Sequence, residues 1–161
     1  MIILGIDPGL ATTGYGVINA EGSRYKLLDY GVISTAAHTP LETRLKDLYE
    51  TLLKLIDHYR PDTASVEELF FSTNVKTAMK VSHARGCILL ALAQRQIPSF
   101  HYTPLQLKSC ICGYGQADKK QIQYMVKQLL NLPKVPRPVD AADALALAIC
   151  HSHHYRLQST V

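Results

Sequence analysis

The sequence predicts a single α/β domain built on a mixed β-sheet that helices flank on both faces. Three strand-like segments precede the first helical pattern, and shorter strand-like segments then alternate with helices. Strands joined by short turns pair antiparallel, whereas strands connected through a helix pair parallel, so this order indicates a mixed sheet. A chain of 161 residues suits one domain. We expect that domain to span residues 1–156, followed by a frayed tail at 157–161.

The first three strands are predicted from runs of apolar, β-branched and aromatic residues. Residues 1–6 are continuously apolar, which is typical of a central strand, and the Pro8–Gly9 pair ends that strand in a tight turn. Residues 14–19 and 25–34 are separated by a glycine-containing turn, which indicates an antiparallel hairpin. Asp7 is therefore expected at a strand end.

The first two helices are predicted from their spacing of apolar and small residues. Leucines recur at helical spacing between residues 41 and 56, with Thr39 as the expected N-cap and Pro40 at the first helical position. A short strand at 63–66 leads to Glu67. The next helix is expected over 75–94, with small residues along one face.

The last third of the chain is predicted to hold one strand and three helices. The strand covers 98–102, and Thr103 caps a short helix that ends near the glycines at 113–115. Asp118 caps the next helix. After a linker that contains three prolines, an alanine-rich helix is expected from residue 140 to about residue 155.

The composition is that of a globular protein with a small excess of positive charge. Hydrophobic residues make up 47% and charged residues 19%, which excludes a disordered chain. The 17 Lys and Arg against 13 Asp and Glu are compatible with a polyanionic partner without requiring one. The first apolar run meets a charge at Asp7, too early for a signal or membrane segment, so we expect a cytoplasmic protein. The four cysteines form no C-x-x-C pair and are expected to be reduced.

Four acidic residues from three distant segments are predicted to converge. Asp7 and Glu67 each end a predicted strand. Asp140 and Asp143 are three residues apart at the start of the last helix, and this spacing places them on one helical face. If the first and fourth strands are neighbours and the last helix packs over that edge of the sheet, all four carboxylates meet there.

A convergence of this kind predicts a divalent metal site with nuclease chemistry. Close like charges are stable only beside a cation, and all-oxygen ligation suits Mg²⁺, or Mn²⁺ in its place. Two ions roughly 4 Å apart can activate a water and stabilise the leaving oxygen in phosphodiester hydrolysis. The simpler alternatives make Asp7 a turn residue, Asp140 an N-cap and Glu67 a solvated acid. The apolar run after Asp143 favours the shared site, because its burial draws the acids inward.

Several motifs occur in the order and spacing of one known family. They are Gly5-Ile6-Asp7-Pro8-Gly9-Leu10, Thr13-Gly14-Tyr15-Gly16, Glu67, Asn74, Ala84-Arg85-Gly86 and Asp140-Ala141-Ala142-Asp143-Ala144-Leu145-Ala146. Through these motifs the chain resembles the RuvC family of Holliday-junction resolvases over nearly its whole length. The resemblance implies a ribonuclease-H-like fold and a homodimer that resolves four-way DNA junctions by paired symmetric nicks. It also implies 5′-phosphate and 3′-hydroxyl products, and branch-migration motor proteins as partners.

The resemblance also assigns roles to individual residues. The implied catalytic residues are Asp7, Glu67, Asp140, Asp143 and Lys119, of which the four acids hold one or two ions per subunit. Glu67 is preferred to the adjacent Glu68 on the family's spacing. The residues expected at the DNA are Phe70, Asn74, Lys76, Lys80, Arg85, Lys108 and Lys119.

Some features keep two interpretations at this level. The small-residue helix at 75–94 either packs on its own sheet or forms the dimer interface, and the family resemblance favours the interface. Arg85 either contacts phosphate or is an ion-pair partner within the fold. Phe71 is more readily a core residue than a DNA contact. The segment 109–114, with two cysteines, departs from the glycine-rich loop usual in the family. Cys150, His153 and His154 share a helical face and suggest zinc, but three ligands near a chain end favour solvated histidines.

Two other function classes compete with the nuclease. Asp7-Pro8-Gly9 also resembles the phosphate loop of actin-like and sugar-kinase ATPases, but those enzymes need two domains and a second glycine-rich motif. A catalytically inactive junction-binding module would tolerate loss of the acids, and all four are present.

Overall fold

The computed structural model describes residues 1–68 and 74–159 and contains one five-stranded sheet. The strands are β1 (Ile2–Asp7), β2 (Thr12–Glu21), β3 (Arg24–Ser34), β4 (Thr63–Glu67) and β5 (Ser99–Tyr102). Their order in the sheet is β3-β2-β1-β4-β5. The strand β2 pairs antiparallel with both β1 and β3, whereas β4 pairs parallel with β1 and β5 pairs parallel with β4. The predicted mixed sheet is confirmed, and the condition that the first and fourth strands are neighbours is met.

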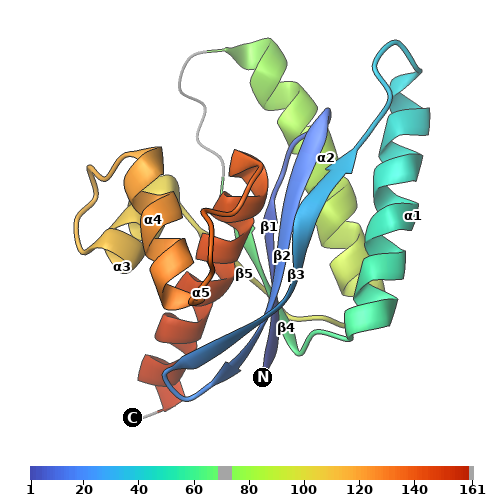
Figure 1. Cartoon of the computed structure of the whole chain (residues 1–161). Helices are drawn as coiled ribbons and strands as arrows, with labels where there is room; N and C mark the ends of the chain where they lie inside the picture. The colour runs from blue at the N-terminus through green and yellow to red at the C-terminus, as the bar shows by residue number, and fades with distance from the viewer. Residues whose placement is uncertain (69–73, 160–161) are drawn as a thin grey trace.

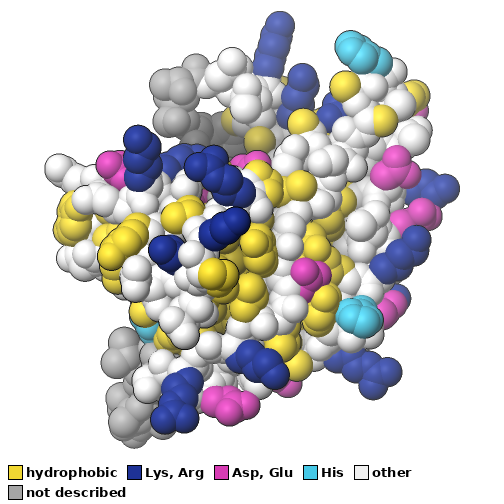
Figure 2. Space-filling view, viewed as in Figure 1, with side chains coloured by type: hydrophobic (Ala, Val, Ile, Leu, Met, Phe, Trp, Pro, Cys, Tyr) yellow, Lys and Arg dark blue, Asp and Glu magenta, His cyan; other side chains and the backbone are white. Residues whose placement is uncertain are grey.

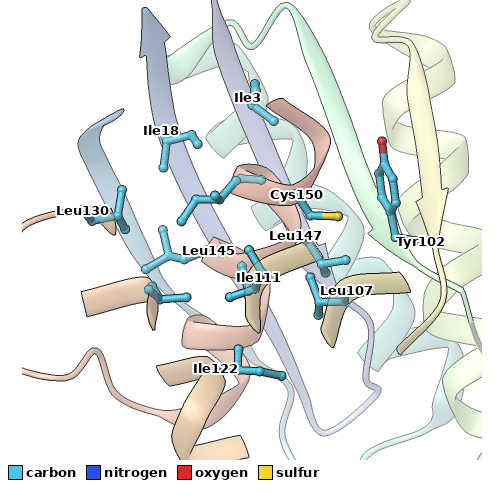
Figure 3. Close-up of a cluster of buried hydrophobic side chains, with 14 of the residues drawn as sticks. Ile3, Ile18, Tyr102, Leu107, Ile111, Ile122, Leu130, Leu145, Leu147 and Cys150 are labelled. Atoms are coloured by element: carbon cyan, nitrogen blue, oxygen red, sulfur yellow. The ribbon is translucent and has the colours of Figure 1, made fainter. Parts of the chain in front are cut away.

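Helices cover both faces of the sheet, so the molecule has three layers (Figure 1). The helices are α1 (Leu41–Tyr59), α2 (Val75–Gln94), α3 (Pro104–Cys112), α4 (Lys119–Leu129) and α5 (Val139–Ser159). One hydrophobic core lies between the sheet and α1 and α2, and a second lies under α3, α4 and α5. Figure 3 shows the second core, where Leu145 and Leu147 of α5 face residues of β1, β2 and α3. In the described residues, no helix combines the length and apolar character that a membrane crossing requires.

At helix starts, the structure corrects one prediction and excludes one alternative. Thr39 does not cap α1, because its hydroxyl donates to the carbonyl of Ala36 in the preceding turn, and Pro40 precedes the helix instead of opening it. Asp140 is not an N-cap either, since α5 begins at Val139 and places Asp140 inside the first turn. The capping roles predicted for Thr103 and Asp118 are confirmed, each within a capping box.

Glycines on β1 and β2 let α5 lie unusually close to the sheet. A Cβ atom on Gly5 would stand 1.9 Å from the carbonyl oxygen of Ala144, and one on Gly14 would stand 2.0 Å from that of Asp140. No side chain fits at such distances, so only glycine allows this approach. The start of α5 is thereby held against the end of β1.

Candidate active site

Asp7 and Glu67 lie side by side at the carboxyl ends of two parallel strands. The strands β1 and β4 pair in register, with Ile6 opposite Val66, so that the next residue of each strand emerges at the same edge. Alternate residues of a strand face opposite sides of the sheet, and it is Glu67 that interacts with Asp7, whereas Glu68 is exposed. The choice of Glu67 over Glu68 therefore agrees with the geometry.

The first turn of α5 brings the other two acids to the same edge. Asp140 and Asp143 both act electrostatically on Asp7. Asp143 is 9% exposed and is followed by residues 144–150, which are fully buried. Burial of this apolar run against the sheet, with the close approach at Gly14, fixes where the two carboxylates stand. Four acids distant in sequence thus share one site at the end of the sheet where α5 begins (Figure 1).

The raised pKa values of the clustered acids show that burial and mutual repulsion disfavour their ionised forms. Burial raises the pKa of Asp7 to about 9, and the charge of Glu67, a hydrogen bond to Glu67 and the two aspartates of α5 act in the same direction. Burial also raises the pKa of Glu67, against the opposing effect of its hydrogen bond with Asp7. The pKa of Asp143 rises to about 6, first through burial. Protonation of these carboxyl groups therefore reduces their mutual repulsion when no cation is bound.

The donor set fits hard divalent cations, because it consists of carboxylate oxygens alone. Among the described residues, no three of the four acids have carboxylate oxygens that all lie within 4.8 Å of one another. Asp7 and Glu67 instead share a hydrogen bond.

Lys119 is the predicted site residue that contacts the acids directly. It opens α4, and its Nζ lies 3.6 Å from Oδ2 of Asp143 while the side chain stays 70% exposed. Its charge lowers the pKa values of Asp143 and Glu67 and so opposes part of the effect of burial. A cation that touches the acids and solvent together is placed to meet a phosphate.

The other predicted DNA contacts lie on α2, on α3 and in the segment between β4 and α2. Phe70, with Phe71, falls outside the described residues. Asn74 caps α2, where its side-chain oxygen accepts from the backbone amides of residues 76 and 77. Lys76 and Lys80 are exposed on the first turns of α2, and Lys108 is half-buried on α3. Figure 2 shows Lys and Arg side chains gathered in the upper left of the view, with acidic side chains between them.

Arg85 has a partner that the sequence did not suggest. Its guanidinium Nη2 lies 2.9 Å from Nδ1 of His101, which is on β5, and its Nε is buried without a hydrogen-bond partner. Burial and the charge of Arg85 lower the pKa of His101, which favours the neutral ring as an acceptor for the guanidinium. Arg85 thus has a hydrogen-bond partner within the fold, but this partner is a neutral histidine and not the acid that the expected ion pair requires.

Helix α2 has two different faces, which accounts for both interpretations of its small residues. One face packs on the sheet through residues that include Ala84, Ile88 and Ala91. The opposite face exposes large apolar side chains, with Val75 71%, Met79 55% and Leu90 55% exposed. This stripe recurs at intervals of three or four residues and continues through the exposed Ser82 and Gly86.

Comparisons with known proteins give one consistent result. The family model described as crossover junction endodeoxyribonuclease RuvC matches residues 3–151. A relative of that description from Alkaliphilus oremlandii is 60% identical over 153 residues, which cover 95% of this chain and 93% of the relative. The solved Thermus thermophilus RuvC structure superimposes with a TM-score of 0.92 at 35% identity, covering 98% of this chain and 97% of that one. The T. thermophilus protein in complex with a Holliday-junction substrate gives 0.94 at 34% identity, covering 99% and 97%.

Proposed function

The chain belongs to the RuvC family of crossover junction endodeoxyribonucleases, and from this premise we propose that its four clustered carboxylates form the catalytic metal site of a Holliday-junction resolvase. The protein is a nuclease and a hydrolase that acts on DNA, with a ribonuclease-H-like fold and a function in recombination and repair. Its substrate is the four-way junction, the DNA bound in the related complex. Family membership also overturns the ATPase alternative.

We assign metal binding to Asp7, Glu67, Asp140 and Asp143, with Mg²⁺ as the ion, Mn²⁺ as a substitute and one or two ions per subunit. The observation that carries this assignment is the convergence of buried acids whose pKa values are raised by burial and mutual repulsion. Bound cations would lower the pKa of an attacking water and neutralise charge on the scissile phosphate. The carboxylates, which β1, β4 and α5 bring to one end of the sheet, would hold such ions there.

Lys119 completes the catalytic machinery in this proposal. Its ammonium group stands at the mouth of the site beside Asp143. A cation there can bind the phosphate next to the cleaved bond and offset the charge that develops on the leaving oxygen. Departure of the 3′ oxygen yields the 3′-hydroxyl and leaves the phosphate on the 5′ end.

We propose that the exposed apolar stripe of α2 forms the interface of a homodimer. Its spacing of three and four residues is the pattern by which two helices pack along their length. Gly86 lies within the stripe and leaves open space around its backbone, which permits close helix contact. A two-fold interface presents two identical sites to two strands of like polarity, as paired symmetric nicks require.

The remaining contacts are assigned by their position around the site. Lys76, Lys80 and Lys108 project cations that can follow the phosphate backbone without reading sequence. The assignments of Phe70, Asn74 and Arg85 as DNA contacts are part of the same proposal, together with branch-migration motor proteins as partners and a cytoplasmic location.

A cleavage assay with matched substrates tests this function. Labelled four-way junction and linear duplex of the same sequence are incubated with protein in Mg²⁺ or in EDTA. The expected result is paired nicking of the junction only, in Mg²⁺ only, with 5′-phosphate ends. Asp7→Asn removes one metal ligand without adding charge, so we expect it to abolish nicking while junction binding in EDTA persists. Unchanged nicking by Asp7→Asn would refute the metal assignment.

A further inference from the structure

A second cluster of metal-ligating side chains lies between α3 and α5, away from the acids. Cys110 is on α3, and Cys150 and His154 are one turn apart on α5. The ligand atoms of these three side chains all lie within 4.8 Å of one another, and no other set of three Cys, His, Asp or Glu side chains among the described residues meets that criterion. His153 adds a fourth ring, with Nδ1 at 3.4 Å from Sγ of Cys110.

The spacing of these atoms matches that of a tetrahedral zinc site. With Zn–S near 2.3 Å and Zn–N near 2.0–2.1 Å, tetrahedral angles place sulfur and nitrogen ligands about 3.6 Å apart. The observed separations are 3.4 Å from Cys110 Sγ to His153 Nδ1 and 3.7 Å from Cys150 Sγ to His154 Nδ1. These two Cys–His pairs therefore have the spacing that one tetrahedral ion requires, and His153, which lies outside the 4.8 Å group, has to move closer to the other ligands to complete the site.

The environment also favours a soft, thiophilic metal. Cys150 is fully buried at the edge of the hydrophobic core shown in Figure 3, whereas Cys110, His153 and His154 are half-buried, which leaves an entry route. The Cys110 sulfur lies 3.9 Å from the carbonyl oxygen of Cys150 and 3.4 Å from His153 Nδ1, so it faces polar atoms of α5 at the edge of the core. His154 Nδ1 lies 3.0 Å from the carbonyl oxygen of Cys150, a hydrogen bond that the ring gives up when Nδ1 ligates an ion.

We propose that Cys110, Cys150, His153 and His154 bind one structural Zn²⁺ ion that clamps α3 onto α5. The ion would tie the helix that carries Lys108 to the helix that carries Asp140 and Asp143. The two sites are distinct, because Asp143 and Cys150 are seven residues apart on α5, which corresponds to about 10 Å along the helix axis. The site stabilises the nuclease domain and takes no part in phosphodiester hydrolysis.

Cobalt substitution tests the proposal through the ligand sulfurs. Untagged full-length protein is purified metal-free with a phosphine reductant and titrated with Co²⁺. The expected result is thiolate-to-cobalt charge-transfer absorption with the intense visible bands of tetrahedral Co²⁺, saturating at one equivalent per chain. Added Zn²⁺ should displace the cobalt and erase these bands. Ions held by the four carboxylates give no such charge-transfer band, so this readout is independent of the catalytic site.

Two cysteine variants on the same helix supply the comparison. Cys110→Ala removes a ligand and should abolish the charge-transfer band and weaken Zn²⁺ binding by about 100-fold or more, since even the loss of an outer hydrogen-bond partner costs 10–100-fold. Cys112→Ala is the matched control, because Cys112 lies outside the cluster, and it should bind like the parent chain. In the presence of excess Mg²⁺ to occupy the carboxylates, Zn²⁺ should raise the Tm of the parent and of Cys112→Ala by more than that of Cys110→Ala.

Three outcomes would overturn the proposal. The first is absence of the charge-transfer band in the fully reduced parent chain. The second is a Cys110→Ala variant that retains the band. The third is a disulfide between Cys110 and Cys150, detected by thiol titration of protein purified without reductant, in a chain that still binds no metal at these cysteines after reduction.

Discussion

Gly14→Ala should disable the nuclease without removing any catalytic group. The added Cβ would stand 2.0 Å from the carbonyl oxygen of Asp140 and 2.4 Å from its carbonyl carbon, whereas ordinary contact begins at 3.4 Å. Because 3.4 minus 2.0 is 1.4 Å, the start of α5 has to withdraw from β2 by roughly that distance. Backbone meets backbone at this point, so no flexible side chain can absorb the clash.

This displacement acts on both stability and catalysis. Overpacking of this kind costs about 1–3 kcal/mol in unfolding free energy. A misplacement of about 1 Å at a catalytic site costs roughly 100-fold in rate, and α5 carries two of the four acids. We therefore expect a folded variant that cleaves junctions at least about 100-fold more slowly in Mg²⁺. Its junction binding in EDTA should change little.

Urea denaturation and single-turnover junction cleavage measure the two effects separately. Thr51→Ala is the control, because Thr51 is exposed on α1, across the sheet from α5, and it should leave stability and cleavage nearly unchanged. A Gly14→Ala variant with parental cleavage and parental stability would show that the close approach of α5 does not position the acids.

Three further perturbations probe the charges and the dimer. The folded-state pKa of Asp7 lies above its ordinary value of 3.8, so the native state binds more protons than the unfolded state between pH 4 and pH 9. The unfolding free energy of the metal-free protein should therefore fall as the pH rises across that range. The Asp7→Asn variant should show a shallower slope. Chemical denaturation in EDTA at several pH values measures this slope, and an increase in stability with pH would contradict it. Lys119→Met removes the charge that lowers the pKa of Asp143, so the acidic limb of the cleavage–pH profile should move to higher pH, and an unmoved limb would argue against the contact. Met79→Glu places a charge in the exposed stripe of α2, and sedimentation should show monomers where the parent chain forms dimers.

Much of the site could be predicted because its residues occupy recognisable local positions. Asp7 ends an apolar strand, and Asp140 and Asp143 share a helical face before a buried run, features that short segments of sequence reveal. Local sequence patterns do not predict that β1 and β4 are neighbours, because strand order depends on how the chain crosses the sheet. Only the folded register brings Glu67 beside Asp7.

The features that sequence reasoning missed depend on contacts between distant segments. Gly5 and Gly14 stand inside strands, a signal of close backbone approach that could have indicated where α5 packs. Nothing local to Arg85 identifies His101 as its partner. The zinc interpretation counted ligands on one helix alone, and Cys110 joins them only because α3 packs on α5. Thr39 was predicted wrongly because a hydroxyl near a helix start can bond backward as well as forward.

Counting bound ions on the DNA-free protein tests the central claim most directly. Metal-free protein is titrated with Mn²⁺ near pH 8, and free Mn²⁺ is followed by electron paramagnetic resonance, with Mg²⁺ added as a competitor. The four-carboxylate site predicts one or two ions per chain that Mg²⁺ displaces and that Asp7→Asn loses. Equal Mn²⁺ binding by the parent chain and by Asp7→Asn would contradict it.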